Sequence, residues 1–422
     1  MKYGFSMLIA AMICLSLCTY AQIPSARIPD GLGVNIHFTD PQPGEMEMLA
    51  AAGFKFIRMD YQWAGIEKTR GQYDFAPWDR LLAACEKVGI RPMYILDYSN
   101  PLYDKNESPR SDEGIAAFAR WAAASVVHFR GHHIIWESYN EPNGFWKPVP
   151  EVGAMIKLAL ATGKAIKAAA PDEIYVGPAL AGTGTDWLEP CYKSGLLEYW
   201  DAVTVHPYGE TNPETRNFAP MQQMIDRYTP PGKHIPLCTG EWGFTSAHVS
   251  AQTQGKYLAR EFLNNLSQHI PLSIWYDWHD DGTDPHNGEH RFGTVAHEYH
   301  AGRDPVFDPK PAYHAAQTLT HQLEGFSFAM QVKLPKPEDY LLLFSDGDKI
   351  RAAAWTTAKD SHTVELPAAA GRFTVTSVFG ERLPDADSTN ALTLELTDGP
   401  KYLIPSHETD AAWRDLIAHN SK

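Results

Sequence analysis

The sequence predicts an α/β protein built on a (β/α)8 TIM barrel, followed by a small C-terminal antiparallel β-sandwich. Short runs rich in β-branched residues alternate with amphipathic helical segments, and this pairing occurs eight times between residues 33 and 323. Each parallel pair of strands needs a crossover, and eight strand-helix units close a barrel. After Phe326, short strand patterns without intervening helices predict the second, all-β domain.

The expected elements follow one another in a regular order. The barrel strands are expected at 33–37, 54–60, 92–97, 134–139, 174–177, 202–206, 235–239 and 272–278. The helices are expected at 45–53, 77–89, 111–130, 150–170, 186–200, 219–228, 250–270 and 311–323. The second domain has strand patterns at 340–344, 350–355, 362–366, 373–378 and 392–396, separated by turn residues. We therefore expect a leader at 1–21, the barrel at 22–325, the β-sandwich at 326–406 and a tail at 407–422.

The N-terminus has the pattern of a secretory signal peptide. Lys2 precedes an apolar run from Met7 to Cys18, and a small-x-small cleavage site ends at Ala21. The run is shorter than the ~20 residues that cross a bilayer, so we expect no membrane span. Export to the periplasm or the medium is predicted. A lipid anchor on Cys18 is disfavoured, because Leu17 stands where a small residue normally precedes a lipidated cysteine.

Composition excludes some partners and chemistries. The chain has 36 Lys and Arg against 51 Asp and Glu, a formal charge of −15, and no basic run, which argues against a nucleic-acid partner. Strongly anionic glycans are disfavoured for the same reason. Beyond the leader, Cys85, Cys191 and Cys238 are widely spaced, which predicts buried thiols rather than a disulfide framework or a metal site. No cofactor-binding motif is present, and no cofactor is expected.

Polar residues follow several of the expected strands at the end where barrel active sites form. Two of them are carboxylates: Glu141 follows the fourth strand and Glu241 follows the seventh. A pair of carboxylates on opposite sides of one bond is the arrangement that hydrolyses glycosides, with one group as acid and the other as nucleophile or base. The sequence therefore favours a glycosidase whose partner is an oligosaccharide or polysaccharide.

Particular motifs resemble known enzymes. The segment Trp136 to Asn143 is similar to the Asn-Glu-Pro motif of clan A glycoside hydrolases, and Thr239 to Gly243 is similar to the nucleophile motif of that clan. The resemblance is nearest to family 39, with family 5 as the broader relative, and covers roughly residues 30 to 325. Segments 71–75, 97–103 and 310–313 have counterparts there.

The resemblance implies roles for individual residues. Glu141 would be the acid/base and Glu241 the nucleophile of a retaining double displacement, with the two carboxyl groups about 5 to 5.5 Å apart. Arg58 and Tyr208 would stabilise the Glu241 carboxylate, and Asn140 would contact the sugar 2-hydroxyl. His206 would lie near the acid/base. Trp275 or Trp278 would form the aromatic floor beneath the sugar. Further candidate sugar contacts are His37, Asp97, Asn100 and Trp146.

Two other functions fit parts of the pattern. A non-catalytic carbohydrate-binding barrel would keep the aromatic cleft, although both glutamates are present. A metal-dependent barrel enzyme would use the acidic and histidine-rich loop 279–290, but this loop has neither the calcium-loop nor the zinc-protease spacing, so no metal is expected. Glu137 precedes Glu141 by four residues and is expected to face a buried partner within its strand.

Overall fold

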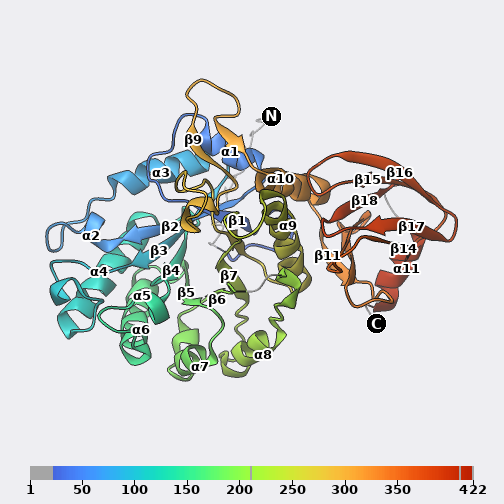
Figure 1. Ribbon diagram of the computed structural model, residues 1–422. Coiled ribbons are helices and arrows are strands. Elements are labelled where there is room, and N and C mark those ends of the chain that lie inside the picture. Colours follow the sequence, from blue (N-terminus) through green and yellow to red (C-terminus); the bar gives the residue numbers. More distant parts are fainter. Residues whose placement is uncertain (1–21, 210–211, 408–409, 421–422) are drawn as a thin grey trace, which may run out of the picture.

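The computed structural model describes residues 22–209, 212–407 and 410–420, and the expected signal peptide lies outside this part of the chain. A closed barrel of eight parallel strands forms the larger domain (Figure 1), so the predicted barrel is confirmed. Its strands are β1 Leu32–Asn35, β2 Phe56–Gln62, β3 Arg91–Asp97, β4 Ile135–Ser138, β5 Ile174–Ala181, β6 Val203–His206, β7 Leu237–Trp242 and β8 Ser273–Trp275.

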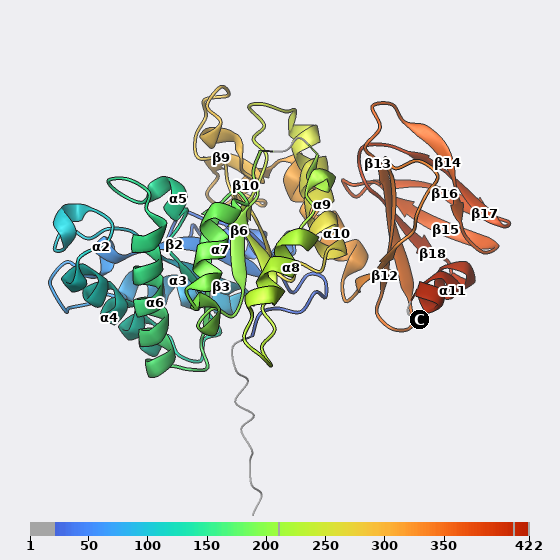
Figure 2. The same cartoon turned by 90° about the horizontal axis from the view of Figure 1, so that it is seen from below.

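Helices surround the barrel, as the apolar periodicity predicts (Figure 2). The main ones are α1 Glu45–Ala51, α3 Ala76–Lys87, α4 Asp112–His128, α6 Val152–Ala169, α7 Thr185–Lys193, α8 Ala219–Tyr228, α9 Ala251–Ser267 and α10 Pro311–Leu323. Two short helices, α2 Trp63–Ile66 and α5 Pro142–Phe145, follow β2 and β4 directly. A hairpin of β9 Val295–Tyr299 and β10 Phe307–Pro309, absent from the predicted elements, lies between β8 and α10.

The last barrel strand is shorter than its predicted range. After Trp275 the backbone groups bond to the ends of the two neighbouring strands, β7 and β1, and to the connection that follows β8. The amide of Tyr276 donates to the carbonyl of Trp242 (2.9 Å), and the amide of Trp278 donates to that of Asn35 (3.0 Å). The carbonyl of Asp277 accepts from the amide of Thr294 (3.0 Å). Residues 276–278 therefore form part of the barrel mouth rather than of the strand.

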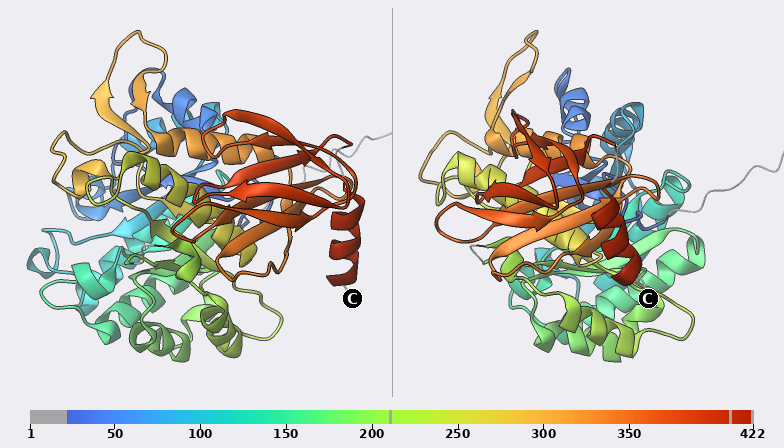
Figure 3. Two further views of the ribbon diagram at one scale, coloured as in Figure 1. Left: turned by 45° about the vertical axis from the view of Figure 1, so that its right-hand side comes forward. Right: turned by 90° about the vertical axis from the view of Figure 1, so that its right-hand side faces the viewer.

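The second domain is an eight-stranded antiparallel sheet, in agreement with the predicted β-domain. Its strands are β11 Ser327–Gln331, β12 Asp339–Ser345, β13 Ile350–Thr356, β14 His362–Pro367, β15 Gly371–Thr376, β16 Arg382–Ser388, β17 Ala391–Leu396 and β18 Lys401–Pro405. Leu341 of β12 and Leu366 of β14, from opposite parts of the strand order, share one core, so the sheet folds over itself. Helix α11, Ala411–Asn420, covers one end of this domain (Figure 3).

The two domains share an apolar interface. Side chains alternate along β12 and β13, and while one face fills the core of the β-domain, Leu342, Phe344 and Trp355 from the other face join the barrel core. One buried polar contact crosses the same interface: Trp355 Nε1 donates to Glu214 Oε1 (2.6 Å), which Arg260 of α9 also binds. The β-domain is thus packed directly against α9 and the segment before α8.

In the described residues, no helix combines the length and the apolar composition that crossing a bilayer requires. Cys85, Cys191 and Cys238 are free and buried, as predicted.

Candidate active site

Glu141 stands on a strained backbone at the mouth of the barrel. It follows β4 and starts α5, with φ 41° and ψ 58° in the left-handed region that side-chain-bearing residues rarely adopt. Its amide donates to the carbonyl of Ala179 (2.9 Å), and its own carbonyl accepts from the amides of Gly144 and Phe145. These bonds fix the residue between β5 and α5 and thereby hold its carboxylate at one place.

Glu241 lies at the end of β7, where the register to β8 shifts between Thr239 and Trp242. Both of its carboxylate oxygens accept hydrogen bonds. Arg58 Nη1 lies 2.8 Å from Oε2, and the hydroxyl of Tyr208 lies 2.7 Å from Oε1. These are the partners that the sequence analysis named for this carboxylate. A cation and a hydroxyl donor together stabilise its charged form.

Arg58 connects the polar groups under the cavity. Its side chain is completely buried in β2, and its Nε donates to Glu137 Oε2 at 2.6 Å. Its Nη2 donates to Asn140 Oδ1 at 2.8 Å and lies 3.2 Å from His206 Nε2. Glu137 thus has the buried partner that its place in the strand predicted, and this partner is the arginine that binds Glu241.

The partners of His206 determine its tautomer. A guanidinium only donates, so His206 Nε2 accepts from Arg58 and the ring proton lies on Nδ1. Nδ1 in turn lies 2.8 Å from Glu141 Oε1 and donates to it. Burial lowers the pKa of His206 to about 4, although the charge of Glu241 opposes this shift. The imidazole is therefore a neutral donor to Glu141 at neutral pH.

The two glutamates have different surroundings but lie close together. Burial raises the pKa of Glu141, and the charge of Arg58 opposes that shift only in part. Glu241, in contrast, has both oxygens bound by donors. One carboxylate oxygen of each, together with a ring nitrogen of His206, forms a group whose members lie within 4.8 Å of one another. A neutral acid and an anion can thus face the same small space.

The glutamates open into a cavity of about 430 Å³ at the carboxyl ends of the strands. Six residues that the sequence analysis singled out line it: His37, Arg58, Asn140, Glu141, Tyr208 and Glu241. His206 lies directly beneath, bonded to Glu141. The cavity also has lining residues that the sequence analysis did not name: Asn35, Asp60, Tyr98, Phe145, Tyr276, Glu289 and Phe292.

The expected aromatic floor of Trp275 or Trp278 is wrong. Trp275 is fully buried and packs near Phe244, while Trp278 is 1% exposed and donates through Nε1 to Glu45. Neither lines the cavity; Tyr276, between them, does. Successive side chains of an extended chain point to opposite sides. Tyr276 therefore faces the cavity while its neighbour Trp275 faces the surrounding helices.

Three other expected sugar contacts, Trp146, Asp97 and Asn100, do not line the cavity. Trp146 is 1% exposed and packs on the ring of Tyr139, whereas Phe145 before it is 50% exposed and lines the cavity. Asp97 is fully buried and does not line the cavity. The side-chain Nδ2 of Asn100 donates to the backbone carbonyl of Glu67 (2.9 Å) and so holds the two loops together. These corrections have one cause: each of these side chains turns inward beneath the rim.

Some of the unnamed lining residues stand beside residues that the sequence analysis did name. Tyr98 follows Asp97, one of the named residues, and its hydroxyl accepts from Asn140 Nδ2 (2.9 Å). Tyr276 lies between two named tryptophans. Glu289 lies in the loop 279–290 that the sequence analysis considered, and Phe292 follows it closely; both reach the cavity from the long connection after β8.

An eight-stranded barrel with carboxylates after strands four and seven defines the class of clan A glycoside hydrolases, as the motifs predicted. The family model described as Cellulase (glycosyl hydrolase family 5) matches residues 33–282, more than half of the chain. The chain belongs to this family and is a glycosidase. No curated protein matched the chain.

Solved structures with the same fold include family 39 and family 30 enzymes. A family 39 glycoside hydrolase from Bacteroides cellulosilyticus WH2 superposes with a TM-score of 0.79 at 24% identity, covering 91% of this chain and 82% of that one. A family 39 β-xylosidase from Caulobacter crescentus superposes with a TM-score of 0.65 at 19% identity, covering 92% of this chain and 98% of that one. A family 30 endoxylanase from Clostridium papyrosolvens C71 superposes with a TM-score of 0.64 at 12% identity, covering 90% of this chain and 97% of that one.

Proposed function

We propose that the protein is an exported retaining glycosidase that cleaves neutral oligosaccharides or polysaccharides, with Glu141 as acid/base and Glu241 as nucleophile. One observation carries the proposal. Two carboxyl groups face one cavity, and burial raises the pKa of the first while Arg58 and Tyr208 bind both oxygens of the second. Opposite environments on two neighbouring carboxyl groups are what acid and nucleophile roles need.

In the first step, the carboxylate of Glu241 attacks the anomeric carbon, and the bond to the leaving oxygen breaks. Glu141 gives its proton to that oxygen, so the leaving group departs as an alcohol. The hydrogen bond from His206 Nδ1 to Oε1 of Glu141 leaves Oε2 to carry the transferred proton. As the proton leaves, the same bond stabilises the new carboxylate.

In the second step, Glu141 acts as a base. It takes a proton from water, the water oxygen attacks the anomeric carbon, and the bond to Glu241 breaks. Glu241 returns to the carboxylate that Arg58 and Tyr208 bind. One carboxylate oxygen of Glu141 lies within 4.8 Å of one oxygen of Glu241. This closeness supports double displacement, because inverting enzymes keep their carboxyl groups about 6.5 to 9.5 Å apart to fit a water molecule between them.

The cavity lining favours a neutral sugar. Asp60, Glu141, Glu241 and Glu289 line it, against His37 and an Arg58 already paired with two glutamates. A second cavity of about 420 Å³ shares Tyr98 and Phe145 with the first, which supports a substrate longer than one sugar. The β-xylosidase and endoxylanase among the similar folds suggest β-xylosides and xylan as first substrates to try.

The decisive experiment follows hydrolysis of defined oligosaccharides by NMR. Retention predicts that the first product has the anomeric configuration of the substrate; an inverted product would exclude a covalent intermediate on Glu241. Glu241→Gln should abolish turnover, with a circular dichroism spectrum and a cooperative melting curve that show the fold to be intact. Glu298→Gln, an exposed change on β9, serves as the matched control and should retain full activity.

Export is tested separately. The precursor, expressed in a Gram-negative host, should appear in the periplasm or medium with an N-terminus at Gln22. A lipid-modified Cys18 at the N-terminus of the mature chain would replace this proposal by membrane anchoring, and an intact N-terminus in the cytoplasm would exclude both.

A further inference from the structure

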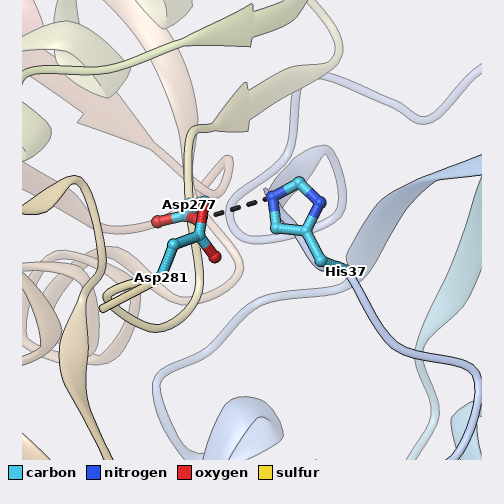
Figure 4. A group of neighbouring side chains, drawn as sticks. All are labelled: His37, Asp277 and Asp281. Carbon is cyan, nitrogen blue, oxygen red and sulfur yellow. Dashed lines mark ion pairs between the residues drawn. The ribbon is translucent and has the colours of Figure 1, made fainter. Parts of the chain in front are cut away.

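A second group of possible metal-binding side chains lies at the rim of the barrel, beside the glutamates. It consists of His37 after β1 and of Asp277 and Asp281 after β8, and we call it the rim cluster. One donor atom from each residue lies within 4.8 Å of the other two. Figure 4 shows the two carboxylates and the imidazole turned toward a common point. The cluster brings together residues that are about 240 positions apart in sequence.

Asp277 is the unusual member of the rim cluster. Its side chain is fully buried, and neither carboxylate oxygen accepts a hydrogen bond from any residue that the structure describes. Its one ionic neighbour is His37, whose Nε2 lies 3.5 Å from Oδ2, longer than the 2.7 to 2.9 Å of an ordinary charge-assisted bond. A buried carboxylate without donors is costly. Asp277 therefore lacks the partner that its burial requires.

The neighbouring charges do not supply that partner. Lys310 and Arg291 are the nearby cations, but they pair with Asp280, at 2.6 Å and 3.3 Å. In the described part of the chain, no lysine or arginine forms an ion pair with Asp277 or Asp281. Asp60 adds a further negative charge near His37. The rim cluster thus combines an excess of negative charge with an imidazole nitrogen.

We propose that the rim cluster binds one Zn²⁺ ion through His37 Nε2 and the carboxylates of Asp277 and Asp281. Zn²⁺ takes imidazole nitrogen and carboxylate oxygen together, and three protein ligands with an open fourth position is a frequent arrangement for it. Ca²⁺ prefers six to eight oxygen ligands and does not match this donor set. The ion would give Asp277 the partner it lacks. Its ligands come from two distant segments, so no spacing motif in the sequence revealed them.

The site is distinct from the catalytic glutamates, although Glu141, His206 and Glu241 are also three close donors. In that group His206 Nδ1 carries a proton and Nε2 accepts from Arg58, and both oxygens of Glu241 are bound by Arg58 and Tyr208. The rim cluster has no such competing donors. Since His37 lines the cavity, an ion there would lie close to sugar hydroxyls. Zinc binding does not depend on the proposed double displacement.

The test titrates the chelator-treated full chain with ZnCl₂ in an isothermal calorimeter. One tight site per chain is expected, together with a rise in melting temperature. His37→Gln and Asp281→Asn, both at the rim, should each weaken binding about tenfold or more. Glu298→Gln should leave binding unchanged. Circular dichroism melting of the zinc-free variants confirms folding, and the exposure of His37 makes His37→Gln the safer change.

Three results would overturn the proposal. The first is no saturable zinc binding. The second is binding that His37→Gln and Asp281→Asn leave intact; if Glu241→Gln abolishes that binding, the ion lies on Glu141, His206 and Glu241 instead. The third is tighter binding of Ca²⁺ than of Zn²⁺. Each readout is independent of hydrolysis, so failure here is separable from failure of the glycosidase mechanism.

Discussion

Nε of Arg58 lies 2.6 Å from Oε2 of Glu137, and both side chains are completely buried. Arg58 also binds Glu241, so one buried cation is shared between Glu137 and the carboxylate that we propose as the nucleophile. Glu137 is therefore a positioning residue: it holds the guanidinium in place for Glu241. The contact links the stability of the barrel to the environment of Glu241.

Glu137→Gln should lower both stability and activity. The variant keeps the shape of the side chain but removes the charge that balances Arg58, and breaking a buried ion pair from one side costs about 3 kcal/mol or more. Denaturant unfolding should show the loss, and kcat should fall about tenfold or more as Arg58 shifts. Asp40→Asn, which removes one partner of the exposed pair with Arg80, is the control and should change neither quantity appreciably. Wild-type unfolding in Glu137→Gln would contradict the positioning role.

Tyr208→Phe should weaken catalysis. The hydroxyl donates to Glu241 Oε1 at 2.7 Å, and without it this carboxylate keeps only Arg58 of its two described donors. A hydrogen bond to a charged group contributes about 1.5 to 3 kcal/mol, so kcat/KM should fall about ten- to a hundredfold. Tyr228→Phe removes a hydroxyl bonded to Glu189, which does not line the cavity, and should keep the wild-type kcat/KM.

His206 should make the fold sensitive to acid. Burial lowers the pKa of His206 from 6.5 to about 4, so its contribution to stability is fully present above pH 6.5. Below that, the unfolded chain binds the proton first, and about 3 kcal/mol is lost as the pH falls toward 4. The melting temperature of His206→Gln should therefore fall less between pH 7 and pH 4.5 than that of the wild type. The raised pKa of Glu141 acts in the opposite direction, and equal slopes for both proteins would contradict the assignment.

The same variant tests the contact with Glu141. Without the Nδ1 donor, the charged form of Glu141 loses a stabilising hydrogen bond, so its pKa should rise further. The basic limb of the kcat/KM profile should then shift to higher pH. A basic limb that stays where the wild-type limb lies would mean that His206 does not donate to the acid/base.

Gly240→Ala should lower stability and activity, because the added methyl group would displace Glu137 and His206 beneath the cavity. A Cβ at this position would lie 2.8 Å from Glu137 Oε1 and 3.3 Å from His206 Nε2, so these buried groups would have to move. Overpacking of this kind costs about 1 to 3 kcal/mol, and activity should fall with it. Gly153→Ala is the matched control. Gly153 lies in α6 with nothing within 4 Å of the added Cβ, and the change should stabilise the protein by about 0.5 to 1 kcal/mol. Thermal unfolding separates the two.

The barrel could be predicted because local patterns determine it, whereas the rim depends on long-range bonds. Each barrel strand and each covering helix has its own apolar period, and the Glu141 and Glu241 motifs mark strand ends. The orientation of Trp275 and Tyr276 depends instead on the long-range bonds that the chain makes where β8 ends, such as the bond from the amide of Tyr276 to the carbonyl of Trp242. No local pattern reports such a bond. The burial of Asp277 escaped prediction for the same reason.

The β-domain was predictable as a class and less so in detail. Five of its strands stand out as short apolar or alternating runs, but β11, β16 and β18 are half-exposed or carry mixed patterns, and the sequence analysis did not name them. The interface also lay beyond local patterns. Which face of β12 and β13 meets the barrel is fixed by the apolar surfaces that both domains present.

The contact between Trp355 and Glu214 connects the β-domain to the segment that carries Tyr208. Glu214 is also bound by Arg260, and two residues further on Arg216 donates to the carbonyl of Tyr208. A continuous series of contacts thus connects the β-domain to the hydroxyl that binds Glu241. A barrel cut free after Leu323 would lose Trp355 and leave Glu214 with one partner fewer, beside an uncovered apolar face. For an engineer, the barrel and the β-domain therefore form one unit, and new modules belong beyond α11 rather than between the domains.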